Sequence, residues 1–464
     1  MPSKSSIGRT VSLDEKYTLE SGRVFLTGIQ ALVRLPMVQR QRDVAAGHDT
    51  AGYVSGYRGS PLGTLDQQLT RAGELLERHH VKFNPGVNED LAATACWGTQ
   101  QIGFSGENAY DGVFAMWYGK GPGVDRSGDA LRHGNLAGSA PLGGVLCLLG
   151  DDHICESSTT AHQSEFAMVD AMIPVLNPAG VQEILDYGLY GIALSRYSGC
   201  WAALKCVHDT VEASASIEVG PDRAVPIVPR EHVLPEDGVH IRFPDASLEQ
   251  EARLHEHKIE AAKAFCRANR LDRTVFPGPR ARVGVVTAGK SYLDVRQALD
   301  DLGIDETNAH THGLRLYKVA MTWPLEPEGA RAFCKDLDFV VVVEEKRALI
   351  ETQLKTLMYG REGAPIITGK QDVRGWQQFR SANRLDPNHI AAVIGRALLV
   401  HDGNAELEPA VQRLEQIADA GSGPAPALLR TPYFCPGCPH NSSTKVPEGM
   451  RALSGIGCHY MAQW

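Results

Sequence analysis

Apolar and polar positions alternate in blocks along most of the chain. Short, nearly continuous apolar runs at residues 50–57 (TAGYVSGY), 112–118 (GVFAMWY) and 143–150 (GGVLCLLG) have the length and composition of buried strands. Loops rich in glycine, proline or aspartate follow these runs, and polar helical stretches such as residues 64–80 lie between them. Buried strands that alternate with helices predict an α/β fold with a doubly wound parallel sheet, covered by helices on both faces.

The same pattern resumes after a charged helical stretch near residue 260. ARVGVVTAG, LRLYKVAM and DFVVVVEEK read as further strands, and SYLDVRQALDDLG reads as a helix that ends at glycine. We expect a polar tail at residues 1–20, a first α/β domain at 21–240, a helical connector at 241–279, a second α/β domain at 280–401, one helix and a linker at 402–430, and the start of a third domain at 431–464.

Composition narrows the function classes. Hydrophobic residues make up 43% and charged residues 22% of the 464 positions, which is typical of a globular protein. The formal net charge is −9 and no block of lysine and arginine is present, so we expect no nucleic-acid partner. The apolar runs are too short to span a membrane, and the N-terminal residues lack the apolar core of a secretory signal. We therefore predict a cytoplasmic protein without a membrane partner.

Three of the ten cysteines are clustered near the end of the chain, and the other seven lie singly in apolar stretches, as small buried side chains do. Cys435, Cys438 and Cys458 could bind zinc, with His440 or His459 completing four ligands. They could instead form a redox dithiol, or supply three ligands of a [4Fe–4S] cluster, which normally takes four thiolates. Spacing alone leaves these alternatives open, together with unligated thiols.

Glu89 and Asp90 lie directly before an alanine-rich helix, at the junction that follows a predicted strand. Acidic residues in the first turn of a helix stabilise its N-terminus, and on the residues alone this is the stronger interpretation. A carboxylate at such a junction could also serve a cofactor. Thiamine diphosphate requires one, because a carboxylate on its pyrimidine nitrogen drives the aminopyrimidine into the imino form that deprotonates the thiazolium carbon.

Several longer strings carry a resemblance to a known family. They are ESGRVFLTGIQALVRLP, SGYRGSPLGTLD, NEDLAATA, WYGKGPGVDRSGDALRHGN, GDDHICESSTTAHQSE, VVTAGKSYLDVRQAL, VVEEKRALIETQLK and FCPGCPHNSS…GIGCHYM. From residue 17 onward, the chain resembles the N-terminal part of the large indolepyruvate ferredoxin oxidoreductases. This family belongs to the thiamine diphosphate-dependent 2-oxoacid:ferredoxin oxidoreductases.

The resemblance implies a role for each part of the chain. Residues 21–240 would be a pyrimidine-binding domain with Glu89 as its activating glutamate. Residues 280–401 would resemble the transketolase C-terminal domain, and residues 431–464 would begin a thiamine diphosphate-binding domain. The implied reaction is oxidative decarboxylation of indolepyruvate, or another aryl or bulky 2-oxo acid, to an acyl-CoA. Coenzyme A and ferredoxin would be partners, and the full-length protein would be a homodimer.

The resemblance also assigns candidate ligand contacts. Tyr57, Arg58 and Ser60 occupy the position of a Tyr-Pro-x-Thr-Pro loop that faces cofactor and substrate, although Arg58 and Ser60 replace that loop's proline and threonine. Lys120 and Arg126, in a glycine-rich loop, could meet a carboxylate, or could belong to a plain surface loop. Polar residues after the strand at 143–150 could orient a 2-oxo acid, or could make turns and helix caps: Asp152, Ser157, Ser158, Thr159, His162 and Gln163.

The Mg²⁺ and diphosphate site is expected elsewhere. Residues 150–152 (GDD) with Asn177 superficially match the Gly-Asp-Gly…Asn signature, but the second aspartate, Asp152, would repel a diphosphate. We therefore expect the Mg²⁺ and diphosphate ligands beyond Trp464. Relatives place a cluster at a similar Cys-Pro-Gly-Cys and Gly-x-Gly-Cys, so the resemblance favours [4Fe–4S] at the three cysteines, with a fourth thiolate also beyond Trp464. The chain is expected to be a fragment, inactive by itself.

Two other functions stay open at this point. A non-oxidative thiamine diphosphate enzyme, of the decarboxylase or transketolase type, would not need the three cysteines. A zinc-stabilised assembly protein would bind zinc and would not respond to thiamine diphosphate. The identity of the 2-oxo acid, the electron acceptor and the oligomeric state are not determined by the sequence.

Overall fold

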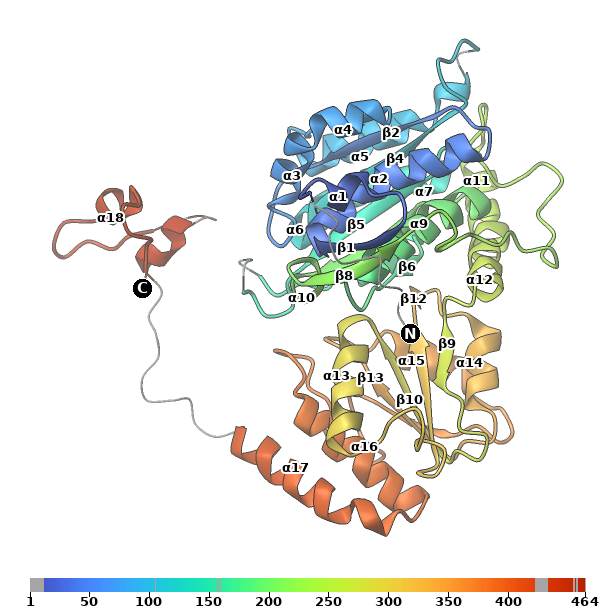
Figure 1. Cartoon of the computed structure of the whole chain (residues 1–464), viewed down its shortest axis with the longest axis vertical. Helices are drawn as coiled ribbons and strands as arrows, with labels where there is room; N and C mark the ends of the chain where they lie inside the picture. Colours follow the sequence, from blue (N-terminus) through green and yellow to red (C-terminus); the bar gives the residue numbers. More distant parts are fainter. Residues whose placement is uncertain are drawn as a thin grey trace, which may run out of the picture. The chain divides into compact units, whose positions relative to one another are not determined.

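The structure is a computed structural model that describes residues 12–104, 106–156, 158, 160–421, 433–453, 455 and 458–463. It divides into two compact units, residues 1–415 and 416–464. The first unit contains two α/β sheets with their helices (Figure 1). The described part of the second unit contains the short helices α18 (His440–Ser443) and η4 (Cys458–Gln463), and helix α17 (Glu408–Gly421) spans the division.

A seven-stranded sheet forms the core of the N-terminal region, in the order β12-β6-β7-β5-β4-β2-β3. Six neighbouring strands run parallel, and β12 pairs antiparallel with β6 at the edge. The strands are β2 (Thr50–Gly56), β3 (Val81–Phe83), β4 (Gly112–Lys120), β5 (Val145–Asp151), β6 (Val175–Leu176), β7 (Ala202–Val207) and β12 (Met321–Trp323).

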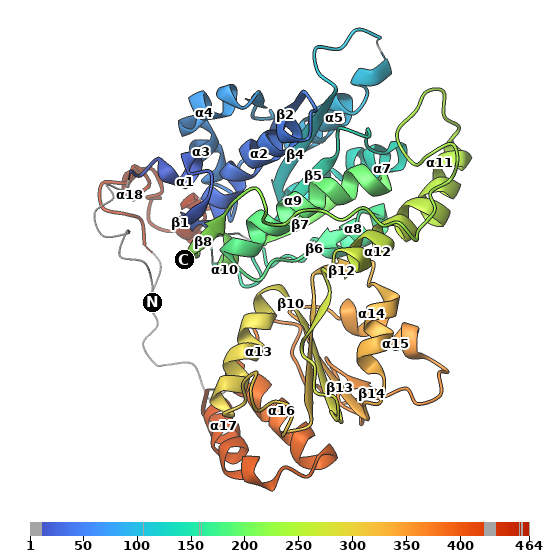
Figure 2. The same cartoon turned by 45° about the vertical axis from the view of Figure 1, so that its right-hand side comes forward.

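Helices cover both faces of this sheet. Helices α2 (Gly28–Ala45) and α9 (Val181–Ser198) pack side by side on one face (Figure 2), and α5 (Glu89–Thr99) and α7 (Gly128–Ala137) cover the other. Successive residues of β5 therefore enter different cores. Leu146 and Leu148 pack with residues of α2 and α9, whereas Cys147 and Leu149 pack with residues of α5 and α7. The predicted doubly wound α/β fold is confirmed.

The second sheet has five strands in the order β14-β13-β10-β11-β9, parallel except for β9. Its strands are β9 (Arg273–Phe276), β10 (Val283–Ala288), β11 (Leu314–Val319), β13 (Phe339–Val343) and β14 (Ile366–Thr368). One core holds residues of α13 (Gly289–Asp301) and α16 (Pro387–His401), and the other holds residues of α14 (Pro327–Cys334) and α15 (Ile350–Met358).

The apolar pattern did not predict several of the strands, and three of these show how distant segments pair. Strands β1 (Gly22–Thr27) and β8 (Ser214–Val219) form a separate antiparallel pair. Strand β12 leaves the five-stranded region and pairs with β6, whose outer edge would otherwise expose unpaired backbone groups. The N-terminal sheet is thus completed by residues that follow β11 in the chain.

The remaining elements are short or connect these layers. They are α1 (Glu15–Thr18), α3 (Leu65–Arg71), α4 (Gly73–Arg78), η1 (Ile102–Phe104), α6 (Gly121–Arg126), α8 (Glu165–Ala171), α10 (His208–Val211), α11 (Ser247–Arg253), η2 (Leu254–Lys258), α12 (Ile259–Ala268) and η3 (Ala405–Leu407). Within the described ranges, no helix has both the length and the apolar character needed to cross a membrane.

Candidate active site at the carboxyl edge of the seven-stranded sheet

Glu89 is the first residue of α5, and its side chain is buried with 5% of its surface exposed. The capping role at this helix end belongs to Asn88, whose side-chain oxygen accepts a hydrogen bond from Leu91 N at 2.8 Å. The backbone oxygen of Glu89 accepts a bond from Trp117 Nε1 at 2.8 Å, which fixes the residue against β4. None of the described residues donates a hydrogen bond to its carboxylate, which leaves that group available to a ligand.

The turn from β4 into α6 makes room for this carboxylate. A Cβ atom at Gly123 would lie 2.5 Å from Glu89 Oε1, and one at Gly119 would lie 3.4 Å from Glu89 Cγ. Any larger residue at position 123 would therefore collide with the glutamate. The glycines at positions 119 and 123 leave room for Glu89 at the carboxyl ends of β2 and β4, which is where parallel α/β sheets bind ligands.

The loop after β2 lies at the same edge. A Cβ atom at Gly59 would be 2.7 Å from Lys120 Cδ, so the lysine packs on this loop. The Arg58 guanidinium lies 5.9 Å from the centre of the Tyr57 ring, with both residues exposed, and Ser60 is half-buried. The structure thus gathers these four predicted residues near the ends of β2 and β4. Arg126 ends α6 with an exposed side chain.

Two aspartates organise the loop that follows β5. Asp152 accepts hydrogen bonds from the backbone of Glu156 (3.1 Å) and Ser158 (2.9 Å). Asp151 accepts bonds from Ser164 N (2.8 Å) and Ser164 Oγ (2.6 Å). Both carboxylates of the GDD string therefore shape the loop. Two further predicted residues, Ser157 and Thr159, lie outside the described residues.

His162 bridges two acidic side chains in this loop. Its Nδ1 lies 3.4 Å from Asp151 Oδ1 and its Nε2 lies 2.9 Å from Asp125 Oδ2. The hydrogen bond to Asp151, reinforced by Asp125, outweighs burial and raises the pKa of His162 to about 9, so the imidazole is cationic at neutral pH. Burial alone would raise the pKa of Asp151, but His162, Lys205 and Ser164 lower it to about 2.

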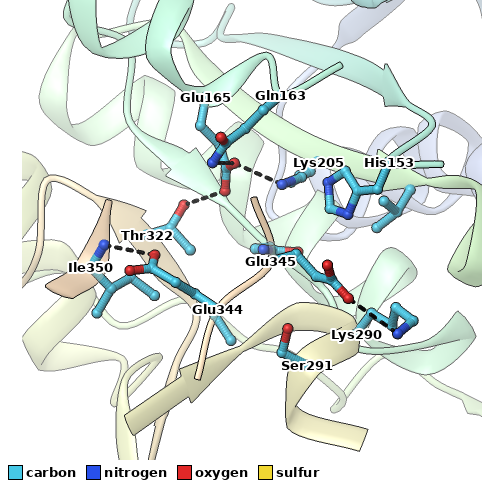
Figure 3. Close-up of a pocket in the computed structure, with 13 residues that line it drawn as sticks. His153, Gln163, Glu165, Lys205, Lys290, Ser291, Thr322, Glu344, Glu345 and Ile350 are labelled. Carbon is cyan, nitrogen blue, oxygen red and sulfur yellow. Dashed lines mark hydrogen bonds and ion pairs between the residues drawn. The ribbon is translucent and has the colours of Figure 1, made fainter. Parts of the chain in front are cut away.

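The same loop contacts the five-stranded region. Gln163 Oε1 accepts a hydrogen bond from Arg347 N at 3.1 Å, and Gln163 Nε2 donates to Glu165 Oε2 at 3.1 Å. Glu165 forms a buried ion pair with Lys205 at 2.7 Å. Gln163, Glu165 and Lys205 line a polar cavity at the facing carboxyl ends of strands from both sheets (Figure 3).

Sequence reasoning missed several groups in this cavity. Glu344 follows β13, and its carboxylate accepts three backbone hydrogen bonds, from Leu349, Ile350 and Glu351, at 2.9–3.0 Å. Burial nevertheless raises the pKa of Glu344 to about 7. His153 is buried, and neither ring nitrogen has a hydrogen-bond partner among the described residues. A signal was visible in the sequence, because Lys205 interrupts the apolar run AALKCV and the acidic pair follows FVVVV.

The three clustered cysteines lie in the second compact unit, and all are free thiols. Cys438 Sγ lies 3.3 Å from His440 Nδ1, and the rings of His440 and His459 are 6.1 Å apart. Cys435 and Cys458 are exposed. Across the residues with described positions, no group of three or more His, Cys, Asp and Glu side chains is arranged to hold a metal ion.

Comparisons with known proteins agree with this geometry. Residues 273–421 match the family model described as the indolepyruvate oxidoreductase domain. The chain is 24% identical to indolepyruvate oxidoreductase subunit IorA of Methanothermobacter marburgensis over 422 aligned residues. The alignment covers 90% of this chain and 59% of that protein. The chain is 26% identical over 453 residues to the same subunit of Archaeoglobus fulgidus, covering 95% of this chain and 64% of that protein. The chain is similar to the indolepyruvate oxidoreductases along most of its length.

The resemblance identified from the sequence is thereby confirmed. Among solved structures, the 2-oxoglutarate:ferredoxin oxidoreductase of Magnetococcus marinus is similar, with a TM-score of 0.55 and 14% identity over 81% of this chain and 65% of that one. This structural similarity supports the α/β fold described above for this chain. The chain spans about 59% of the length of the first of these indolepyruvate oxidoreductase relatives, so the activity of a whole enzyme is a separate question.

Proposed function

We propose that this chain is part of a thiamine diphosphate-dependent 2-oxoacid:ferredoxin oxidoreductase. The complete enzyme would convert indolepyruvate, or another aryl or bulky 2-oxo acid, to an acyl-CoA and pass electrons through iron–sulfur clusters to ferredoxin. The named relatives and the fold support this proposal. We also propose that the full-length protein is a cytoplasmic homodimer.

The observation that carries the proposal is the buried carboxylate of Glu89 at the glycine turn of residues 119–123. Without a hydrogen-bond donor among the described residues, this carboxylate fits the pyrimidine nitrogen of the cofactor. When bound, thiamine diphosphate supplies the nucleophilic carbon needed for decarboxylation. Glu89 would hold a proton between its carboxylate and the ring nitrogen, and the surrounding buried strands would keep water from that contact.

Other residues at the sheet edge would serve the substrate and the cofactor. Lys120 and the cationic His162 could pair with carboxylates, and the hydroxyl of Ser60 could donate to a keto oxygen. Tyr57 and Arg58 would flank the cofactor on the same loop. We propose substrate contacts from the remaining predicted residues as well: Arg126, Ser157, Ser158, Thr159 and Gln163.

Cys435, Cys438 and Cys458 are proposed as three ligands of a [4Fe–4S] cluster, with a fourth thiolate supplied from outside this chain. The ligands of Mg²⁺ and of the cofactor diphosphate are proposed to come from outside the chain as well. Asp151 and Asp152, the acidic groups of the GDD string, already accept hydrogen bonds from their own loop, which supports this choice.

The test is a pair of matched variants in the complete enzyme. Glu89→Gln removes the charge and keeps the shape, and is expected to lower 2-oxo acid- and coenzyme A-dependent reduction of a viologen dye at least 100-fold. Asp90→Asn makes the same change one residue later in the same helix turn and should retain activity. Full activity in the Glu89→Gln enzyme would remove Glu89 from this role.

A further inference from the structure

Trp117 in strand β4 ties the candidate catalytic glutamate to the sheet. Its ring packs in the core that contains residues of α5 and α7, and none of its surface is exposed. The indole Nε1 donates a hydrogen bond of 2.8 Å to the backbone oxygen of Glu89. Strand β4 lies inside the seven-stranded sheet, between β2 and β5, so the first residue of α5 is fastened to a rigid element.

The other ties at this junction hold the chain just before Glu89. The backbone N–H groups of Asn84 and Gly86 donate to carbonyl oxygens of β2, at 2.9 and 2.8 Å. Asn88 then caps the helix. The bond from Trp117 acts on Glu89 itself and comes from the neighbouring strand, β4. The start of α5 is therefore held from two adjacent strands of the sheet.

The far end of the same ring lies beside the side chain of Glu89. A Cβ atom added at Gly119 would lie 2.7 Å from Trp117 Cη2 and 3.4 Å from Glu89 Cγ, so the space above Gly119 borders both side chains. The indole thus meets the backbone oxygen of Glu89 and lies near its methylene groups. Neither contact uses the carboxylate.

The packing of this core does not by itself require the hydrogen bond. Trp201 provides the comparison, because it is also fully buried and belongs to the same core. Its Nε1 nevertheless has no hydrogen-bond partner among the described residues. This core therefore holds an indole whose N–H is unused, and the bond from Trp117 belongs to the Glu89 junction.

We propose that Trp117 is a positioning residue for Glu89, and that its indole N–H fixes the backbone from which the carboxylate extends. The inference rests on the proposed function, in which this carboxylate shares a proton with the pyrimidine nitrogen of thiamine diphosphate. Such a transfer needs the two heavy atoms within about 2.6–3.2 Å of each other. A displacement of about 1 Å can slow a reaction on the order of 100-fold, so a small shift of this helix end would matter.

The first test follows the backbone without the cofactor. Trp117→Phe removes the N–H and keeps an aromatic ring, and Trp201→Phe makes the same change elsewhere in the same core. In the complete enzyme freed of thiamine diphosphate, amide hydrogen exchange of peptides that contain residues 88–93 should be at least fivefold faster in Trp117→Phe. Exchange in Trp201→Phe should stay within twofold of the unaltered enzyme. Equal exchange in the two variants would overturn the inference.

The second test follows the bound cofactor before any substrate is added. Replacement of the thiazolium C2 proton by deuterium, stopped with acid and measured by nuclear magnetic resonance, reports the activation that Glu89 promotes. Trp117→Phe should slow this exchange at least tenfold and lower kcat, with KM for the 2-oxo acid within threefold of its unaltered value. Trp201→Phe should keep all three quantities within threefold. A raised KM with an unchanged exchange rate would contradict the positioning role.

Gly119→Ala disturbs the same contact and keeps the indole, so it serves as the test if Trp117→Phe does not fold. Its C2 exchange should be at least threefold slower, and an unchanged rate would overturn the inference. Failure of the proposed function is distinguishable, because the unaltered enzyme would then bind no thiamine diphosphate in a calorimetric titration. An unaltered enzyme that binds the cofactor, beside a Trp117→Phe variant with equally fast C2 exchange, would overturn only the inference.

Discussion

Gly123 packs directly against the side chain of Glu89. A Cβ atom added at position 123 would lie 2.5 Å from Glu89 Oε1, so only glycine fits there while the glutamate keeps its position. The glycine belongs to α6 and the glutamate to α5, so two separate strand-to-helix connections together define where the carboxylate lies. This relationship gives a test of the site that leaves Glu89 itself unchanged.

Gly123→Ala is expected to displace the Glu89 carboxylate and lower dye reduction by the complete enzyme at least tenfold. Far-ultraviolet circular dichroism should stay unchanged, with a loss of about 1–3 kcal/mol in stability from overpacking. Gly128→Ala is the control, because a Cβ there meets nothing within 4 Å. Equal activity of the two variants would show that the position of the carboxylate is unimportant.

His162 gives stability a defined pH dependence. Its folded-state pKa of about 9 exceeds the usual 6.5, so its contribution is fully present below pH 6.5 and disappears as the pH rises through 9. His162→Gln should therefore cost roughly 1–3 kcal/mol at pH 6 and much less at pH 10, measured by urea unfolding at both values.

The exposed His133 provides the comparison, since its nearest acidic partner, Asp129, is also exposed. His133→Gln should change the free energy of unfolding by less than about 0.5 kcal/mol at either pH. A cost of His162→Gln that stayed constant between pH 6 and pH 10 would contradict the role assigned to the imidazolium.

Lys205 and Glu165 form a buried pair at 2.7 Å. Lys205→Met leaves the carboxylate buried without its partner and is expected to cost about 3–5 kcal/mol, whereas Lys205→Met combined with Glu165→Leu should cost less than the single change. Arg78→Ala, in the exposed pair with Glu74, should cost under about 1 kcal/mol. A double variant less stable than Lys205→Met would contradict this account.

The cysteine cluster is tested by metal analysis of the complete enzyme purified without oxygen. Each of Cys435→Ser, Cys438→Ser and Cys458→Ser should lower iron and acid-labile sulfide together. His440→Ala separates the alternatives, because it leaves a thiolate-bound cluster intact but removes a ligand from a zinc site. Bound zinc in place of iron, lost on His440→Ala, would favour the zinc site instead.

The parts of the fold that the sequence predicted depend on local pattern. Strands β4, β5 and β13 are apolar runs bounded by turns, so their burial follows from the letters alone. Strand β12 has three residues and pairs with a segment about 145 positions earlier, and no local pattern specifies such a partner. The separate β1–β8 pair escaped prediction for the same reason.

In the candidate site, as in the fold, the sequence predicted what depends on local pattern and missed what depends on contacts between distant residues. Glu89 could be singled out because an acidic residue precedes an alanine-rich helix, and the family resemblance then gave it a role. The fit of Gly123 against it, the bridge from His162 to Asp125 and the Lys205–Glu165 pair all depend on contacts between different strand ends. Residue type shows which side chains can ionise, but the three-dimensional fold determines which of them meet.

The edge position of β12 has a consequence for synthesis on the ribosome. The seven-stranded sheet lacks its last strand until the chain has been made as far as Trp323, well after β7 ends at Val207. A nascent chain of intermediate length therefore exposes the free edge of β6, a place where a second nascent chain could pair. Division of the gene between the two sheets would leave that edge uncovered until the second fragment supplied β12.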